Sequence, residues 1–451
     1  MIVTEIPWLD PMTVAANLAS RERLAFLDSA MAHPTLGRWS YVAADPFGVF
    51  QVRDGQAFWN DTPLDQPPLA ALRSCLARFQ RPAVANGPPF QGGAIGTFAY
   101  EAGRLLERLT ETRRTGRGMP AIDMAFYDTL LAFDGLEHCA YLIAPDERAA
   151  RLLRARATTE APRRAPPSGL VWQDSCTRSD YEAKVAAVID YIRNGDIFQA
   201  NLAHRFSATA AQRPDPVATY RALRQANPAP FASLLVDGDR FIASSSPERF
   251  LRLDGGAVET RPIKGTKRRS ADRREDAALA AALVDSEKDR AENVMIVDLL
   301  RNDLSRVCLP GTVKVPVLCG IETYASVHHL TSVVTGLLAP GRDAVDLIAA
   351  TFPGGSITGA PKIRAMEIIA ELEGEDRGIY CGAIGALGFD GSADLNIAIR
   401  TLACEGQTLS VSAGGGITLL SEPAAEYEET ITKAERLLGA FGGLLRADAA
   451  A

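Results

Sequence analysis

Pro262-Ile263-Lys264-Gly265-Thr266 places a lysine between a proline and a glycine, after an alternating segment at residues 256–260 and before a charged one. Alternation of this kind is typical of a half-buried strand, so we expect a strand at residues 256–260. Taken alone, Lys264 is an ordinary structural lysine that pairs with an acid. The segments that follow it give it another interpretation.

Two acidic segments follow this lysine, and each places its charged residues on one face if it is helical. The two sets are Asp285, Asp289 and Glu292, and Glu422, Glu426, Glu429 and Lys433. One interpretation is two solvated faces with i,i+4 ion pairs, such as Glu429 with Lys433. The other is a metal site, because Asp289 and Glu292 lead directly into an apolar segment at 294–300 and buried carboxylates need a cation or a proton. Oxygen ligands without clustered histidine or cysteine favour magnesium.

Two glycine-rich segments are candidates for binding an anion. Residues 354–359 precede a helix predicted at 361–371, and free N–H groups at a helix start attract anions. Gly414-Gly415-Gly416 follows a predicted strand at 408–413 and precedes a helix predicted at 422–438, and it permits close approach of the backbone to a ligand. Tight turns are the alternative for both. Neither segment matches the common nucleotide-binding patterns, so the anion is as readily a carboxylate as a phosphate.

The chain divides into two parts at a segment rich in proline, alanine and arginine. We predict an N-terminal region at 1–156, a linker or exposed loop at 157–178, a catalytic domain at 179–441 and a tail at 442–451. Further predictions are a long helix at 280–301 and a single strand at 395–404. Strands and helices mix without strict βαβ alternation, which favours an α+β fold.

Composition narrows the class of protein. The 451 residues carry a net charge of −7, which argues against a nucleic-acid partner. Seven cysteines without a C-x-x-C pair indicate reduced thiols in a cytosol. We see no signal peptide and no apolar stretch near the roughly 20 residues of a membrane helix, so we expect a cytoplasmic protein without a membrane partner.

Several short motifs occur in one order along residues 179–441. They are Ser246–Phe250, Pro262–Thr266, Asp285–Asn293, Asp298–Leu304, His329–Ser332, Phe352–Lys362, Ile399–Thr401, Gly414–Ile417 and Glu426–Thr430. In this combination the chain resembles the chorismate-utilising enzymes, which include anthranilate, isochorismate, salicylate and aminodeoxychorismate synthases. The resemblance implies a fold like that of anthranilate synthase component I, with two packed β-sheets forming a sandwich core and helices outside.

Within this family, two positions indicate the reaction. Lys264 resembles the aminodeoxychorismate branch, whereas anthranilate synthases generally carry alanine there. Gln199 stands where isochorismate and salicylate synthases use a lysine to activate water, which argues against water as the nucleophile. The resemblance thus implies amination of chorismate at C4 on the route to para-aminobenzoate and folate, with Lys264 attacking C2 and Glu248 protonating the departing hydroxyl.

The resemblance also implies the remaining site residues. Magnesium would be held by Glu292 and Glu429, with Asp289 and Glu426 nearby. The substrate would be bound by Thr266, His329, Tyr380, Arg400, Gly414, Gly415, Gly416, Lys433, Gln199, Ser356 and Thr358. In relatives, the segments that hold Asp28, Ser29, Arg38 and Ser40 form a tryptophan pocket. Ordinary core strands are the alternative for these four residues, and Asp28 replaces the usual glutamate.

The ammonia must come from another chain. No cysteine lies in the G-x-C-x-G pattern of a glutaminase, so we expect a separate glutamine amidotransferase subunit. Two rival functions stay open. The first is anthranilate synthase component I, which aminates C2 and releases pyruvate; the second is a non-catalytic sensor of chorismate or tryptophan.

Overall fold

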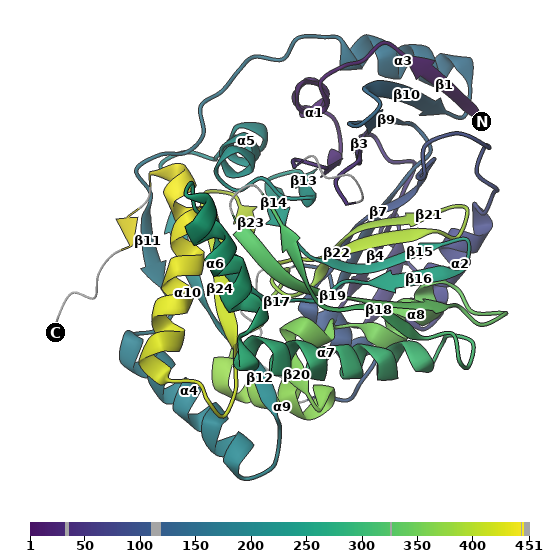
Figure 1. The fold of residues 1–451 in the computed structure, drawn as a ribbon. Helices are drawn as coiled ribbons and strands as arrows, with labels where there is room; N and C mark the ends of the chain where they lie inside the picture. Colours follow the sequence, from purple (N-terminus) through teal and green to yellow (C-terminus); the bar gives the residue numbers. More distant parts are fainter. Residues whose placement is uncertain (32–35, 110–118, 325–326, 443, 446–451) are drawn as a thin grey trace.

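Two large antiparallel β-sheets pack against each other, with helices outside them (Figure 1). The computed structural model describes residues 1–31, 36–109, 119–324, 327–442 and 444–445. Tyr41 and Leu130 of one sheet share an apolar cluster with Ile95 and Ala125 of the other. This architecture confirms the predicted α+β class and its two sheets.

The first sheet holds 13 strands among the described residues. In spatial order they are β1 (Ile2–Ile6), β10 (Cys139–Ala144), β9 (Leu130–Asp134), β3 (Trp39–Ala43), β2 (Ala25–Asp28), β13 (Phe231–Asp237), β14 (Arg240–Ser246), β23 (Thr401–Glu405), β24 (Thr408–Ile417), β12 (Gln199–Thr209), β11 (Val171–Asp174) and β25 (Leu444–Leu445), with β20 (Gly359–Ala360) also paired to β12.

The second sheet holds 12 strands of the described chain. They are β17 (Ile263–Arg268), β19 (Val327–Leu337), β16 (Ala257–Thr260), β15 (Arg249–Asp254), β22 (Ala393–Ile397), β21 (Ala383–Gly388), β7 (Gly93–Phe98), β8 (Ile122–Tyr127), β4 (Gly48–Arg53), β5 (Gln56–Trp59) and β6 (Thr62–Pro63), with β18 (Lys314–Thr323) also paired to β19.

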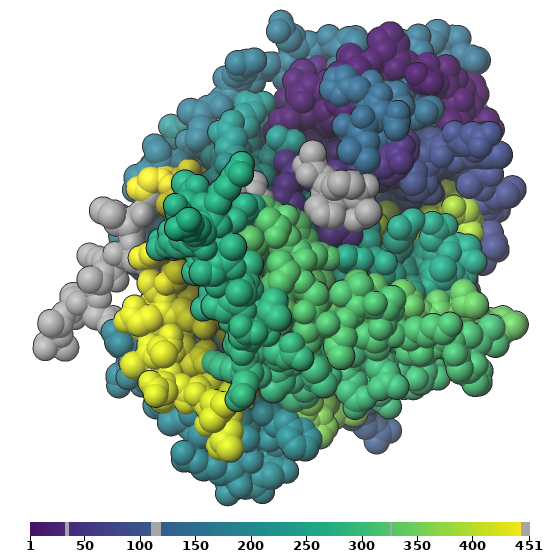
Figure 2. All heavy atoms as spheres, in the orientation of Figure 1, coloured from purple at the N-terminus to yellow at the C-terminus, as the bar shows by residue number. Residues whose placement is uncertain are grey.

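Both sheets combine strands from the first 156 residues with strands from later parts of the chain. β2 pairs with β13 in the first sheet, and β7 pairs with β21 in the second. Figure 2 shows the purple N-terminal residues and the yellow C-terminal residues in one continuous body with the teal and green segments between them. The predicted divide at 157–178 is therefore a divide along the sequence, and the parts on either side of it share their sheets.

Helices cover the outer surfaces of this sandwich (Figure 1). They are α1 (Pro11–Leu18), α2 (Pro68–Arg78), α3 (Glu147–Ala157), α4 (Arg178–Arg193), α5 (Pro216–Ala226), α6 (Arg273–Val284), α7 (Glu287–Ser305), α8 (Ala344–Thr351), α9 (Lys362–Glu373) and α10 (Pro423–Leu438), with 3₁₀ turns η1 (Tyr100–Leu105), η2 (Gly355–Ile357) and η3 (Gly439–Phe441). Side-chain caps begin several of them: Thr177 and Asp180 form a capping box on α4, and Asp10 caps α1.

Four details differ from the expectations. The helix predicted at 280–301 is two helices, because Asp285 ends α6 and Ser286 caps α7 by accepting from the Asp289 N–H. Asp285 thus lies off the α7 face that carries Asp289 and Glu292. The strand predicted at 395–404 is β22 and β23, separated by a corner at Arg400, whose φ is +53°.

The other two differences concern the C-terminal part. The triple glycine lies inside β24, where Gly414, Gly415 and Gly416 pair with Ala203, Leu202 and Asn201 of β12. The expected tail at 442–451 contributes the short strand β25, parallel to β11. No helix of the described residues is long and apolar enough to cross a membrane, and all seven cysteines are free thiols.

Candidate active site

A cavity of about 500 Å³ lies between β17, α7, η2, the end of β24 and α10. Of the predicted site residues it is lined by Glu248, Lys264, Thr266, Asp289, Glu292, His329, Ser356, Tyr380, Arg400, Gly414, Gly415, Gly416, Glu426, Glu429 and Lys433. Residues far apart in the sequence thus meet at one place. Gln199 and Thr358 are the exceptions.

Lys264 enters the cavity from β17, and the shape of this strand depends on the next residue. Gly265 has φ +79° at an irregularity in the pairing of β17 with β19. A Cβ there would lie 2.8 Å from Leu283 Cδ1 and 2.9 Å from Asp289 Cγ, so both conformation and space require glycine. The Lys264 ammonium donates a hydrogen bond of 2.8 Å to the Ser356 carbonyl oxygen. Burial lowers the pKa of Lys264, while the carboxylates of Glu292 and Glu248 act in the opposite direction.

Glu248 lies on the other side of Ser356. The Ser356 hydroxyl donates to Glu248 Oε1 at 2.5 Å, and the Glu248 side chain is buried. Burial raises the pKa of Glu248 to about 7, although the Ser356 hydrogen bond and the Lys264 charge oppose this. The carboxyl group is therefore able to hold a proton near neutral pH. One serine contacts both candidate catalytic groups.

Acidic side chains of α7 and α10 form one wall of the cavity. Burial raises the pKa of Glu292, whereas the ammonium of Lys433 lowers the pKa of Glu429, to which it is bonded at 2.7 Å. Glu426 accepts from the Ser421 hydroxyl at 2.6 Å and lies 3.4 Å from the Lys288 ammonium. The wall thus contains carboxylates that lysines only partly neutralise.

This wall suits a hard divalent cation that also contacts a ligand. Within the described residues, Asp289, Glu292, Glu426 and Glu429 do not bring three carboxylate oxygens within 4.8 Å of one another. Magnesium commonly uses one or two carboxylates together with substrate oxygens and water, so a site completed by the substrate fits this arrangement. Glu292 is half-buried and its pKa is raised, so a bound cation would stabilise its charged form.

Another part of the cavity wall is cationic and aromatic. Burial lowers the pKa of the Arg400 guanidinium, and the neighbouring charge of Arg436 lowers it further. Burial is the largest cause that lowers the pKa of His329 to about 4, and the charge of Arg400 is the next, so this imidazole is neutral. The His329 Nδ1 lies 2.8 Å from the Thr266 hydroxyl. Tyr380 is buried and protonated, because burial raises its pKa. An anionic ligand group would complete this wall.

Gly415 of β24 keeps open the space beside the charged side chains of α10. A Cβ at position 415 would lie 3.1 Å from Glu426 Oε2 and 3.7 Å from Lys433 Nζ. A side chain there would occupy the volume between the acidic side chains and the strand. The Lys433 ammonium also donates to the Gly414 carbonyl oxygen at 2.9 Å, which fixes the lysine against the strand.

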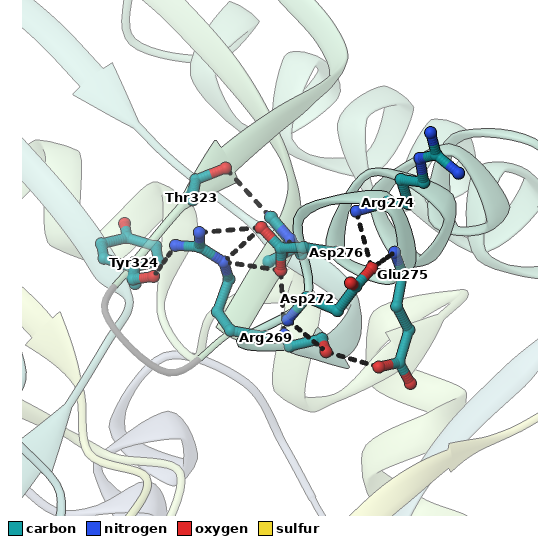
Figure 3. Close-up of polar contacts among 9 residues, drawn as sticks. Arg269, Asp272, Arg274, Glu275, Asp276, Thr323 and Tyr324 are labelled. Atoms are coloured by element: carbon teal, nitrogen blue, oxygen red, sulfur yellow. Dashed lines mark hydrogen bonds and ion pairs between the residues drawn. The ribbon is translucent and has the colours of Figure 1, made fainter.

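A polar network anchors the outer end of β17 (Figure 3). The Arg269 guanidinium donates to the Asp276 carboxylate of α6 at 2.8 Å and to the Tyr324 carbonyl oxygen at 2.9 Å. His328 Nε2 lies 3.0 Å from the same carboxylate, and its Nδ1 lies 3.0 Å from the Thr323 hydroxyl. His328 is thus a structural residue that ties β19 to α6, whereas its neighbour His329 faces the cavity.

The comparisons with known proteins agree with this geometry. A family model described as chorismate binding enzyme matches residues 26–439. The chain belongs to the chorismate-binding enzymes. It is 41% identical over 421 residues to aminodeoxychorismate synthase component 1 of Escherichia coli strain K12, covering 91% of this chain and 92% of the relative. It is 38% identical over 442 residues to anthranilate synthase component 1 of Thermus thermophilus, covering 95% of each chain.

A solved structure shows the same fold. Anthranilate synthase component I from Streptococcus pneumoniae superposes with a TM-score of 0.82 at 35% identity, covering 90% of this chain and 93% of that one. This confirms the expected fold of the chorismate-binding enzyme. The choice between the two activities depends on the cavity.

Two predicted contact residues lie behind the cavity wall of this chorismate-binding enzyme. Gln199 is buried, and its Nε2 fills the space beside Gly416, where a Cβ would lie 2.2 Å away. The Thr358 hydroxyl donates to the Gly354 carbonyl oxygen at 3.0 Å and shapes η2. Both side chains support the wall, and Asn201, two residues after Gln199, lines the cavity instead.

The residues of the candidate tryptophan pocket have polar partners among the enzyme's own side chains. Asp28 accepts from Arg224 Nε at 2.6 Å and from the Tyr220 hydroxyl at 2.7 Å. Ser40 bonds to Asp28 and to the Ser29 N–H, and Arg38 pairs with Asp134 rather than with Asp28. The guanidinium of Arg224 thus already pairs with the Asp28 carboxylate.

The site also contains residues that sequence reasoning missed. They are Asn201, Lys267, Arg268, Lys288 and Arg436. Lys288 stands four residues before Glu292, and Arg436 three residues after Lys433, so helical spacing could have revealed both. Elsewhere, Asp174, Cys176 and His204 cluster outside this cavity, but the 2.6 Å between Asp174 Oδ1 and His204 Nδ1 is a hydrogen bond.

Proposed function

We propose that this chorismate-binding enzyme is component 1 of an aminodeoxychorismate synthase, which replaces the C4 hydroxyl of chorismate with an amino group. The observation that carries the proposal is the convergence of Lys264 and Glu248 on Ser356 inside one cavity. A lysine at this point supplies a nucleophile. Relatives that activate water, or that add ammonia directly to the ring, do not need one. The aminodeoxychorismate synthase relatives at 41% and 45% identity support the same choice.

The protonation states suit a nucleophile beside an acid. The lowered pKa of Lys264 increases its neutral fraction, and only a neutral amine is nucleophilic. The raised pKa of Glu248, about 7, keeps a proton available for a leaving group. Both pKa shifts have burial as their largest cause, so removal from solvent prepares both groups.

The reaction proceeds in two displacements. The Lys264 amine forms a bond to C2, both ring double bonds shift by one position, and the C4–oxygen bond breaks. Glu248 gives its proton to the departing hydroxyl, which leaves as water. Ammonia then forms a bond to C4, both ring double bonds shift back, and the C2–nitrogen bond breaks to release the neutral Lys264 amine. The Glu248 carboxylate takes a proton back from the new ammonium group at C4. The product keeps its enolpyruvyl group.

Carboxylate recognition orients the ring for these steps. Arg400, Tyr380 and the β24 backbone would receive the enolpyruvyl carboxylate, because a guanidinium fork matches two carboxylate oxygens. Glu292 and Glu429, with Asp289 and Glu426 near them, would hold Mg²⁺. Bound there, the ion would supply charge neutralisation for the ring carboxylate.

Ammonia would come from a second subunit with glutaminase activity. The relatives are named as component 1 of their synthases, which supports a second component. The chain has no cysteine in a G-x-C-x-G pattern for glutamine hydrolysis. Free ammonium at high concentration should replace the partner in a test.

The test incubates the purified chain with chorismate, Mg²⁺ and ammonium and separates the products by chromatography and mass. Aminodeoxychorismate that retains its enolpyruvyl group is the expected product. Anthranilate with released pyruvate would instead assign the activity of the Thermus thermophilus relative. An absence of any chorismate turnover, with ammonium or with a glutaminase subunit, would favour a sensor.

A further inference from the structure

Three basic side chains at the cavity have no role in the chemistry above. They are Lys267 and Arg268, at the outer end of β17, and Arg436, in the last turn of α10. All three are exposed and line the cavity. None has a side-chain hydrogen bond or ion pair with another residue of the described chain. Three unpaired cations at the opening of one cavity need an explanation.

The next basic residue in the sequence bonds to other residues and does not line the cavity. Arg269 continues the run, but its guanidinium turns to Asp276 and to the Tyr324 carbonyl oxygen (Figure 3). This anchor fixes the end of β17 on α6. Lys267 and Arg268 therefore stay at the cavity, beside Val327, which also lines it.

Charge changes sign along α10, one of the helices that line the cavity. Glu426, Glu429, Lys433 and Arg436 follow at i, i+3, i+7 and i+10 and lie on one face of α10. The face begins acidic and ends basic. Arg436 is also close enough to Arg400 and to His329 to lower the pKa of each. The cation at the helix end thus reinforces the cationic wall.

The whole molecule has the opposite charge. With 48 basic and 55 acidic residues its net charge is −7, so it repels a dianion at a distance. A local basic entrance offsets this repulsion where the substrate must enter. It also favours entry with one carboxylate turned toward the acidic wall and its cation, and the other held at the basic end.

We propose that Lys267, Arg268 and Arg436 form a basic entrance that recruits and orients a dicarboxylate substrate without taking part in the chemical steps. The inference rests on the proposed function, because it takes chorismate as the dianion. It assigns a task to the Lys267-Arg268 pair that follows the Pro262–Thr266 motif.

The test compares two triple variants with equal loss of charge. Lys267→Gln/Arg268→Gln/Arg436→Gln removes the entrance, and Arg148→Gln/Arg273→Gln/Arg274→Gln removes three exposed arginines that do not line this cavity. At low ionic strength we expect kcat/KM for chorismate to fall about tenfold in the entrance variant, with kcat within about twofold of the parent. The control variant should change less than about twofold.

Salt supplies the second readout. Electrostatic attraction is screened within about 10 Å at 0.1 M salt, so added sodium chloride should lower kcat/KM steeply in the parent and only weakly in the entrance variant. Equal salt slopes in all three proteins, or a loss in kcat with KM unchanged, would overturn the entrance. If the parent turns chorismate into another product, the proposed function fails, and the salt comparison on that product still decides whether the entrance exists.

Discussion

The Ser356 hydroxyl donates to Glu248 Oε1 at 2.5 Å, and the carbonyl oxygen of the same serine accepts from Lys264. A single residue of η2 therefore sets the distance between the candidate acid and the candidate nucleophile. Any movement of this turn changes both groups together.

Lys264→Ala should abolish the formation of aminodeoxychorismate, with a loss of at least about a hundredfold, because it removes the nucleophile. Lys288 and Lys433 are held by Glu426 and Glu429 and do not take its place. Lys264→Arg should fail as well, since a guanidinium stays protonated. Product analysis by mass spectrometry measures both. Lys314→Ala, at the start of β18, is the control. Undiminished product from Lys264→Ala would remove the lysine from the mechanism.

Glu248 should make the fold less stable at high pH. Its pKa is about 7 in the folded protein against an ordinary 4.5, so the folded state keeps this proton to higher pH than the unfolded state. Its contribution to stability is complete below about pH 4.5 and is lost as the pH rises through about 7. Between pH 5 and 8 the parent should lose about 2 to 3 kcal/mol relative to Glu248→Gln in urea unfolding. Glu435→Gln, an exposed change, should show no such difference; a parallel pH course for the parent and Glu248→Gln would contradict the raised pKa.

Removal of the acidic wall should weaken the response to magnesium. We expect Glu292→Gln and Glu429→Gln each to raise the Mg²⁺ concentration for half-maximal activity at least about tenfold, because each removes a carboxylate that would hold the ion. Titration calorimetry of Mg²⁺ with chorismate present gives a second readout. Glu428→Gln is the matched control on α10, since Glu428 pairs with Arg178 outside the cavity. Activity that persists undiminished in EDTA would exclude the ion.

Tryptophan should not bind to the parent. An amino acid ammonium would have to displace Arg224 from Asp28, and a buried carboxylate with a guanidinium at 2.6 Å has no free charge to offer. Calorimetry with tryptophan should show no saturable heat, and tryptophan should leave turnover unchanged. Binding at micromolar concentrations would mean that the Arg224 side chain moves aside.

The sequence predicted the motifs of the site better than their geometry. Lys264 and Glu248 belong to short sequence motifs that can be recognised without knowledge of the fold. The structure brings the two residues together as expected. Gln199 and Thr358 belong to the same kind of motif, but their side chains turn into the wall, and a motif does not state which way a side chain points. Arg436 was missed because a charged residue at the end of a helix is usually solvated.

The points at which helices and strands end were harder to predict than the helices and strands themselves. Residues 280–301 read as one helix because the residues on both sides of Asp285 favour helix, and the Ser286 cap was the available signal against it. The corner at Arg400 depends on a positive φ in a non-glycine residue, and the identity of the residue does not predict such a φ. The triple glycine read as a loop because glycine is rare in strands, whereas close pairing with β12 places it inside one.

The order of strands has a consequence for how this chain is made. β21, β22, β23 and β24 come late in the sequence, yet each is paired on both sides in the interior of its sheet. A ribosome therefore releases most strands of both sheets, β25 excepted, before these central strands exist. Such nonlocal pairing slows folding and leaves strand edges unpaired in the meantime. The growing chain would expose these unpaired edges until residues 383–417 have emerged, and damage to that segment would disrupt both sheets.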